Sequence, residues 1–297
     1  MNDPQVAIIV LCWNGVSDTL ECLRSLRGVD YPDLRVIVVD NGSTDDTFDA
    51  VSDQFPEVEL IQTGENLGFA GGNNVGILHA IETGADAVLL LNNDTVVDAN
   101  FLRPLVDTLY QSEAIGATNP TIYYYDEPKV IWAAGGRLDW ITGVAYQRHL
   151  NEVDLGQLKE PEEIDYGVGT ALLIKREAIE ATGLLDPNFY LYYEETDWCC
   201  RARDAGYSTV LVPSSKIWHK ISKSIGEGNP RQAYYFSRNR LLFLSKRGSG
   251  GIRMAGVMAG YARMAAAMAV RGEGRRSYAT MKGVFDFCCH HYGRAGR

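Results

Sequence analysis

Two short stretches of the chain concentrate side chains that can hold a cation or move a proton. The first is Asn92-Asn93-Asp94, where an apolar run stops at two amides and one carboxylate. Oxygen atoms of this kind are the ligands that hard divalent cations accept. The second is residues 194–197, with three carboxylates in four positions, and such crowding raises the proton affinity of one member. Each stretch also fits a structural role, as a turn or as the acidic first turn of a helix.

The elements before Asp94 determine where the first stretch lies. The expected strands span residues 6–11, 34–39, 58–62 and 87–91, and the expected helices span residues 17–26, 46–54 and 68–79, the first of them capped by Ser17. This alternation is typical of right-handed crossovers and a parallel sheet, and therefore of an α/β fold. Ligands bind such sheets at the carboxyl ends of the strands, which here carry Asn14, Asp40 and Asp94.

The second half of the chain is less regular. We expect strands at residues 171–174 and 210–212, helices at 176–182, 231–245 and 252–270, and an aromatic strand from residue 189 that enters the helix with the second acidic stretch. The helix at 252–270 is interrupted by arginines, and its uncharged stretches are far shorter than the ~20 residues that cross a bilayer. We therefore expect no transmembrane segment there.

Charge is distributed unevenly along the chain. The 297 residues carry a formal net charge of −10, yet from Arg231 onward 13 basic and 2 acidic side chains give 13 − 2 = +11. The other 230 residues hold 15 basic and 36 acidic side chains, a balance of −21. A basic C-terminal segment on an acidic body indicates an anionic partner surface, although a solvated basic face is the simpler alternative. Nucleic acid is not expected as a partner.

Several other site types are disfavoured by spacing. The six cysteines form no CxxC pair and two sets are adjacent, which suits neither a disulfide framework nor a zinc site and indicates a reducing cytoplasm. Four neighbouring ligands in the segment CCHHY at residues 288–292 cannot surround a tetrahedral ion. The segment GFAGG at residues 68–72 is not the dinucleotide fingerprint. The polar start MNDPQ indicates no signal peptide.

Six motifs follow one another between about residues 5 and 245: VAIIVLCWNG, VIVVDNGSTDDT, ENLGFAGGNNVGI, LLLNNDT, YYEETDWCCRARDAGY and IWHK. Together they closely resemble family 2 inverting glycosyltransferases, especially the bacterial and archaeal rhamnosyl- and galactofuranosyltransferases. The resemblance implies a GT-A fold, which is Rossmann-like with a mostly parallel central sheet, over residues 1–245. A donor half at about 1–100 and an acceptor half at about 101–245 would precede a basic helical extension at 246–297.

The resemblance assigns the first polar stretch to a metal-bound sugar nucleotide. The D-x-D triplet of the family corresponds to Asn92-Asn93-Asp94, in which the last acid keeps the metal-ligand role, and His219 of IWHK corresponds to a second ligand. The metal would be Mn²⁺ or Mg²⁺, and an imidazole ligand favours Mn²⁺. The remaining residues expected to bind the sugar nucleotide are Asn14, Asp40, Asn66, Phe69, Asn73, Asn92, Asn93 and Arg238. The expected sugar donor is dTDP-rhamnose, with UDP-galactofuranose or another UDP-sugar as alternatives.

The second acidic stretch is the place for a general base, which an acceptor hydroxyl needs within hydrogen-bond reach. The E-D pair of the family corresponds to Glu194-Glu195, so Glu195 is the expected base and Asp197 the alternative. The acceptor would be a glycan or a lipid-linked sugar. The residues expected to contact it are Trp132, Gly167, Gly169 and Thr170. We expect a cytoplasmic protein, with its basic segment able to lie on the inner face of the cell membrane.

Two other classes of protein fit part of this pattern. A non-catalytic module that binds nucleotide sugars or glycans would explain the reduced acidity of Asn92-Asn93-Asp94, but not the presence of Glu195, Asp197 and His219. A nucleotidyltransferase would share the metal and the sheet. It would also need a basic triphosphate loop near the first strand, where CWNGVSD has no basic residue.

Overall fold

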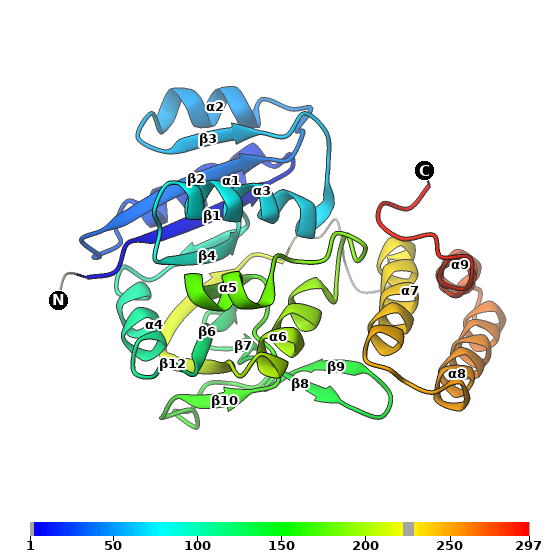
Figure 1. Ribbon diagram of the computed structural model, residues 1–297. Coiled ribbons are helices and arrows are strands. Elements are labelled where there is room, and N and C mark those ends of the chain that lie inside the picture. The colour runs from blue at the N-terminus through cyan, green and yellow to red at the C-terminus, as the bar shows by residue number, and fades with distance from the viewer. Residues whose placement is uncertain (1–2, 222–228, 297) are drawn as a thin grey trace.

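A mixed β-sheet forms the centre of the molecule, with helices packed against it (Figure 1). The computed structural model describes residues 3–221 and 229–296; the other positions of the predicted domains lie outside the described residues. The strands are β1 Val6–Cys12, β2 Leu34–Asp40, β3 Glu59–Gln62, β4 Ala87–Asn92, β5 Thr95–Val97, β6 Ile115–Tyr124, β7 Ile131–Ala133, β8 Gly136–Asp139, β9 Val144–Gln147, β10 Glu162–Ile164, β11 Ala171–Lys175 and β12 Ser208–His219. The helices are α1 Val16–Leu26, α2 Thr47–Gln54, α3 Gly68–Glu82, α4 Leu102–Leu109, α5 Arg176–Thr182, α6 Glu194–Asp204, α7 Pro230–Lys246, α8 Gly251–Val270 and α9 Gly274–Cys288.

The first four strands run parallel, as predicted. Strand β1 pairs with β2 and β4, and β2 pairs with β3. Residues 6–10 are completely buried, which is typical of a strand covered on both faces of a parallel sheet. The register places Cys12 opposite Asp40 and Leu11 opposite Asn92. The polar ends of these strands therefore lie at one edge of the sheet.

The second half of the chain extends this sheet in mixed directions. Strand β11 is antiparallel to β4 and β6, whereas β12 is parallel to β6. As a result β12 ends at the same edge as β4, and β11 begins there. Strand β5 pairs with the end of β12, with Thr95 opposite His219. This pairing brings the first polar stretch of the sequence beside His219.

Two local predictions are wrong. Helix α1 begins at Val16, and its N-cap is Gly15 in the left-handed conformation, so Ser17 does not cap it. Residues 189–193 are not a strand, because Tyr190, Tyr192 and Tyr193 have φ values of 65°, 69° and 75°, far from the β region. Aromatic residues are enriched in strands, but here the rings of Tyr190 and Tyr192 stack on α7.

Helices α7, α8 and α9 pack against one another at one end of the molecule (Figure 1). Asn229 caps α7 by accepting the N–H of Arg231 at 2.8 Å, and Pro230 occupies a first-turn position that needs no N–H. The domain boundary predicted at residue 246 coincides with the end of α7. Because α7 packs against α9, contacts cross that position.

Helix α8 buries little of its apolar surface. Only Tyr261 and Ala265 are buried along its 20 residues, and Ile252 and Val270 are 94% and 89% exposed. Among the described residues, no helix combines the length and the apolar character that a membrane span requires.

Candidate active site

Asp94 and His219 meet where β4 and β12 end. The Oδ1 atom of Asp94 lies 3.1 Å from Nε2 of His219, and the side chains are only 14% and 8% exposed. The N–H of Lys220 donates to the carbonyl oxygen of Asp94 at 2.9 Å, which fixes the two segments together. The indole of Trp132 on β7 lies edge-on to the imidazole, with ring centroids 4.6 Å apart.

The Asp94–His219 pair fits two ligands of one divalent cation. Neighbouring ligands of an octahedral cation with bonds of about 2.1 Å are about 3.0 Å apart, close to the observed 3.1 Å. A carboxylate oxygen suits Mg²⁺ or Mn²⁺, and an imidazole nitrogen favours Mn²⁺. Within residues 3–221 and 229–296 there is no group of three or more His, Cys, Asp or Glu side chains that could hold a metal. Among the described residues, Asp94 and His219 are therefore the two candidate ligands.

The two asparagines before Asp94 connect the end of β4 to its surroundings. The N–H of Asn92 donates to the carbonyl oxygen of Thr170 at 3.0 Å, and the amide of Asn93 donates to the hydroxyl of Thr19 on α1 at 2.8 Å. Asn93 thus anchors the turn to α1, while the partly exposed side chain of Asn92 remains at the sheet edge.

Glu194 and Glu195 form the start of α6. Burial, and then the adjacent charge of Glu195, hold the pKa of Glu194 well above its ordinary value. Burial also raises the pKa of Glu195, but nearby backbone N–H groups, including that of Gly169, oppose the shift. Two crowded carboxyl groups do not both ionise readily. Both shifts favour the protonated form, and the charge of Glu195 adds to the shift at Glu194.

Gly169 lies between the start of α6 and the start of α3. A Cβ atom at this position would be 3.1 Å from the ring of Phe69 and 3.5 Å from Cγ of Glu195. The next residue, Thr170, is the hydrogen-bond partner of Asn92. Through this short segment the structure brings together the expected base, the expected sugar-nucleotide loop and the end of β4.

The other two residues of the expected acceptor loop are packed inside the protein. Gly167 and Thr170 are buried, and a Cβ atom at Gly167 would lie 2.4 Å from the side chain of Leu172. Their contact with the acceptor stays a prediction, and Gly169, which is also buried, lies beside Glu195. Trp132 lies beside His219.

Asp197 is paired with two cations. Its side chain is 1% exposed, and Oδ2 accepts a hydrogen bond from Nε of Arg201 at 2.8 Å and lies 3.7 Å from Nζ of Lys246. Arg201 also donates to the carbonyl oxygens of Thr182 and Leu184. The alternative role of Asp197 as the base stays a prediction, and the structure shows two cations beside its charge, with the pairing fixing α6 to the loop after α5.

The expected sugar-nucleotide residues mostly hold loops together. Oδ1 of Asn14 accepts the N–H of Thr44 at 2.8 Å, which joins the loops after β1 and β2. Asp40 is completely buried, and its two oxygens accept bonds from the Ser43 N–H and the Gln62 side chain. Asp40 therefore organises its loop, which corrects its prediction as a direct contact, whereas Asn14 is partly exposed at the sheet edge.

The loop before α3 is fixed by Tyr190. Oδ1 of Asn66 accepts the Tyr190 hydroxyl at 2.9 Å, and the N–H of Phe69 donates to the Tyr190 carbonyl oxygen at 2.7 Å. Gly68 has φ +77°, and a Cβ atom there would lie 2.4 Å from the Tyr190 ring. Asn73 is 1% exposed and donates to the carbonyl oxygen of Phe69 at 3.0 Å, so it supports the loop from inside α3.

Arg238 does not lie at a phosphate site. It is completely buried, and its guanidinium donates to the carbonyl oxygens of Asn188, Phe189 and Gly293 at 3.2, 2.9 and 2.6 Å. Nε donates to the side chain of Asn239 at 2.9 Å. The predicted contact with pyrophosphate is contradicted by this burial, because Arg238 joins α7 to the segment before α6 and to the C-terminal segment.

Two functional candidates escaped the sequence prediction. Trp13 is 45% exposed at the end of β1, next to Asn14, and the guanidinium of Arg231 lies 5.9 Å from its ring. The sequence carried a signal, because Trp13 directly follows the first strand, at the end where sheets of this type bind ligands. The role of Tyr190 had no such signal, because it depends on the contact between two segments more than 120 residues apart.

The fold defines the class of the protein. It is similar to a mannosyltransferase from Pyrobaculum calidifontis in complex with GDP-Man and Mn²⁺, with a TM-score of 0.62 and 17% identity over 97% of this chain and 88% of that one. This likeness confirms the predicted GT-A architecture, with its mostly parallel sheet and C-terminal helices.

Residues 7–183 match Glycosyl transferase family 2, and the chain belongs to that family. It is 28% identical over 245 residues to an N-acetylglucosaminyl-diphospho-decaprenol L-rhamnosyltransferase of Mycobacterium tuberculosis. The aligned region covers 77% of this chain and 80% of that protein. It is 26% identical over 219 residues to the dTDP-rhamnosyl transferase RfbF of Shigella flexneri, which covers 71% of each. The protein is a glycosyltransferase, and its predicted resemblance to rhamnosyltransferases is confirmed. The family decides against the two alternative classes.

Proposed function

We propose that the protein transfers rhamnose from dTDP-rhamnose, with inversion, to a hydroxyl of a sugar carried on a lipid diphosphate. The observation that carries the proposal is the Asp94–His219 pair, 3.1 Å apart at the sheet edge, with Glu195 connected to that edge through Gly169 and Thr170. The substrates are suggested by the two rhamnosyltransferase relatives, whose names specify a dTDP-linked donor and a diphospho-decaprenol acceptor.

Glu195 acts as the general base in this proposal. Its carboxylate takes the proton of the acceptor hydroxyl as the oxygen attacks the anomeric carbon on the face opposite the diphosphate. The bond from that carbon to the diphosphate oxygen breaks, and the electron pair leaves with the nucleotide. A raised pKa makes Glu195 a stronger base. The buried Oε2 atom of Glu195 has no hydrogen-bond partner among the described residues, which suits a proton acceptor.

Asp94 and His219 would hold Mn²⁺ or Mg²⁺. When bound, the cation supplies positive charge that neutralises the leaving diphosphate. The protein orients these two ligands through the pairing of β5 with β12. Asn14, Asn66, Phe69, Asn92 and the exposed Trp13 would contact the sugar nucleotide along the same edge.

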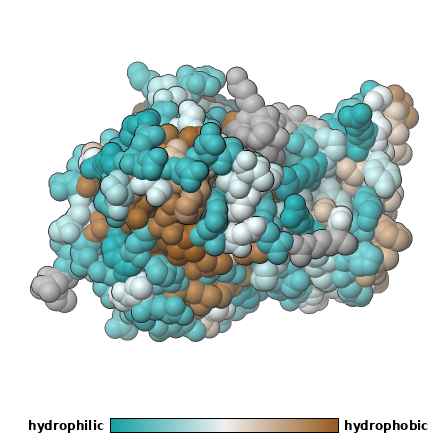
Figure 2. All heavy atoms as spheres, turned by 90° about the horizontal axis from the view of Figure 1, so that it is seen from above, coloured by the Kyte–Doolittle hydropathy of each residue, from teal (hydrophilic) through white to brown (hydrophobic). Residues whose placement is uncertain are grey.

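The C-terminal helices would place the protein on an anionic membrane inside the cell. Residues 251–288 contain six Lys and Arg but two acids, and Figure 2 shows apolar and polar atoms interleaved at the end where α8 and α9 lie. Interfacial helices combine these features. We expect sedimentation with phosphatidylglycerol vesicles but not with phosphatidylcholine vesicles, and loss of binding at high salt. Equal binding to both, or none, would contradict membrane attachment.

Thermal stabilisation by sugar nucleotides tests the proposed sugar donor and metal. A ligand that binds only the folded state stabilises it by about 2.7 kcal/mol at 100 times its Kd. We expect dTDP-rhamnose with Mn²⁺ to raise the Tm more than UDP-sugars do, and EDTA or Asp94→Asn to remove most of the rise. Asp126→Asn, at an exposed position, is the matched control and should keep it. A metal-independent rise, or the same rise in Asp94→Asn, would contradict the assignment.

A further inference from the structure

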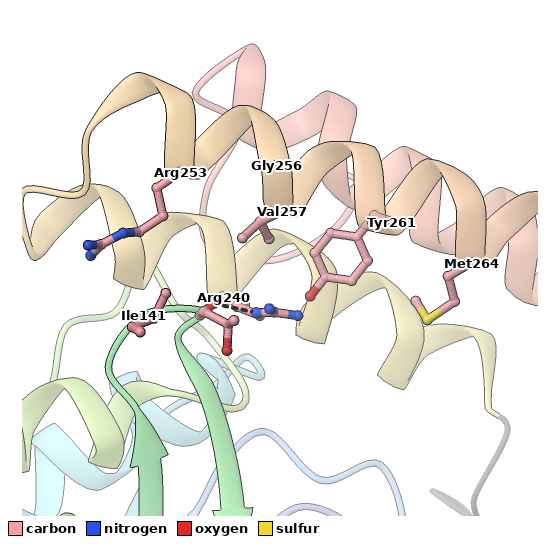
Figure 3. A pocket seen from close by; sticks show the side chains of 9 residues that line it. Ile141, Arg240, Arg253, Gly256, Val257, Tyr261 and Met264 are labelled. Atoms are coloured by element: carbon pink, nitrogen blue, oxygen red, sulfur yellow. Dashed lines mark hydrogen bonds between the residues drawn. The ribbon is translucent and has the colours of Figure 1, made fainter.

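The structure contains a cavity that the proposed chemistry does not use. Its volume is about 430 Å³, within the usual range for small-molecule sites. It lies between the turn of the β8–β9 hairpin and helices α7 and α8 (Figure 3). Ile141 comes from the hairpin, Arg240 from α7, and Arg253, Val257 and Tyr261 from α8.

Two arginines give the cavity a positive charge. Nε of Arg240 donates to the carbonyl oxygen of Thr142 at 2.8 Å, and its guanidinium lies 5.4 Å from the centre of the Tyr261 ring. Figure 3 shows Arg240 extending toward Tyr261, and Arg253 at the other end of the cavity above Ile141. Among the residues that the structure describes, no carboxylate lies within ion-pair distance of Arg240 or Arg253, although, after the hydrogen bond from the Thr142 N–H, the charge of Arg240 contributes to the lowered pKa of Asp139 in the same hairpin. Guanidinium groups without a carboxylate in direct contact suit phosphate, whose oxygens accept their forked donors.

The surroundings of the cavity are apolar and accessible. Val257, Met264 and Ile141 contribute to its lining, and Ile252 and Val270 of α8 are strongly exposed. A ligand that fits both features carries phosphate at one end and a hydrocarbon chain at the other. The two arginines would bind the phosphate, and the exposed face of α8 would accommodate the hydrocarbon chain.

The cavity is joined to the start of the catalytic helix. Tyr193, which directly precedes Glu194, donates its buried hydroxyl to the carbonyl oxygen of Gly143 in the hairpin turn at 2.9 Å. Its ring also contacts Phe236 and Phe243 of α7. The same hairpin turn and helix that enclose the cavity therefore hold Tyr193, and through it the position of Glu194 and Glu195.

We infer that this cavity binds the diphosphate of a lipid-linked acceptor, with Arg240 and Arg253 as its phosphate ligands and the lipid chain along α8. The inference rests on the proposed function, because it assigns the acceptor end of that reaction. It adds a binding site to the sheet-edge residues and explains why the hairpin and the C-terminal helices meet beside the start of α6.

Direct binding tests the inference without requiring turnover. The probe is farnesyl diphosphate, titrated in detergent with EDTA so that the metal-dependent site does not contribute. Arg240→Gln should weaken binding about tenfold or more, since a hydrogen bond to a charged group contributes about 1.5–3 kcal/mol. Gly260→Leu should weaken it similarly, because a Cβ atom at Gly260 meets nothing within 4 Å and the longer side chain can fill the cavity without disrupting the helix. Arg137→Gln, exposed on β8, is the control and should bind as the wild type does.

The outcomes separate the possible sources of phosphate. Inorganic diphosphate and farnesol should both bind more weakly than farnesyl diphosphate; equal binding of inorganic diphosphate would overturn the lipid part of the assignment. Wild-type affinity in both Arg240→Gln and Gly260→Leu, or absence of binding in the wild type, would overturn the site. If binding of farnesyl diphosphate is lost only when phosphatidylglycerol vesicles replace the detergent, the cavity is a site for a membrane headgroup instead. If the cavity binds the probe but dTDP-rhamnose supports no transfer, the proposed function fails and the diphosphate site stands.

Discussion

Replacement of Arg238 by Met separates a structural role from a phosphate-binding one. The Arg238 side chain is completely buried, and its guanidinium donates to three carbonyl oxygens. Two of these oxygens keep another donor, because Gly293 N–H bonds to Asn188 and the Asn239 amide bonds to Phe189. The carbonyl oxygen of Gly293 and Oδ1 of Asn239 lose the donor that the structure shows for them.

The expected cost of Arg238→Met follows from these bonds. A charged hydrogen bond contributes about 1.5–3 kcal/mol, and an acceptor left without a partner costs about 1–3 kcal/mol. Since two oxygens retain donors and a buried charge is removed, we expect a loss of about 2–4 kcal/mol. At roughly 2–4 °C per kcal/mol for a chain of this size, the Tm should fall by about 4–16 °C.

Calorimetry and a binding titration on the same preparation test this reasoning. The Kd for dTDP with Mn²⁺, measured well below the Tm, should stay within about twofold of the wild-type value. Arg137→Met at the exposed position on β8 should change stability by less than about 0.5 kcal/mol. An unchanged Tm together with a much weaker Kd in Arg238→Met would refute the structural role and restore the phosphate contact.

Two further substitutions test the positioning of the site. Burial raises the pKa of Glu194, so the folded state keeps a proton that the unfolded state loses above about pH 4.3. The free energy of unfolding therefore falls as the pH rises toward the folded-state pKa. The slope for one proton is at most about 1.4 kcal/mol per pH unit. Glu194→Gln should flatten this dependence in urea unfolding between pH 5 and 8, and curves parallel to the wild type would contradict the assigned protonation. Gly68→Ala should destabilise the protein more than Gly84→Ala, since both glycines have positive φ but only Gly68 would meet Tyr190. Equal losses in thermal unfolding would show that the Tyr190 contact does not fix this loop.

The first half of the fold was predictable because local patterns determine it. The apolar runs of β1, β2 and β4 are continuous, and helices with clear boundaries separate them, so the parallel sheet and its polar edge follow from general rules. The predicted strand at 189–193 was wrong because aromatic composition cannot reveal positive φ values such as those of Tyr190 and Tyr192.

The sequence predicted the residue types of the site better than it predicted the contacts that these residues make. Asp94 and His219 were expected together, and the structure places them 3.1 Å apart. Arg238 was expected near the pyrophosphate, but its carbonyl contacts come from segments distant in sequence. Asp197 pairs with Arg201 one helical turn away and also with the distant Lys246. Burial and pairing across such distances decide whether a charged side chain meets a substrate or supports the fold.

The central claim is that Glu195 removes the acceptor proton at a metal-dependent rhamnosyl transfer site. The most direct measurement compares Glu195→Gln with the wild type, using one preparation for the Kd of dTDP-rhamnose with Mn²⁺ and for the rate of transfer to a lipid-diphosphate sugar. A general base contributes typically 10²–10⁴-fold, so the rate should fall by at least about 100-fold while the Kd changes by less than about twofold. A rate within about tenfold of the wild type would contradict the role of Glu195.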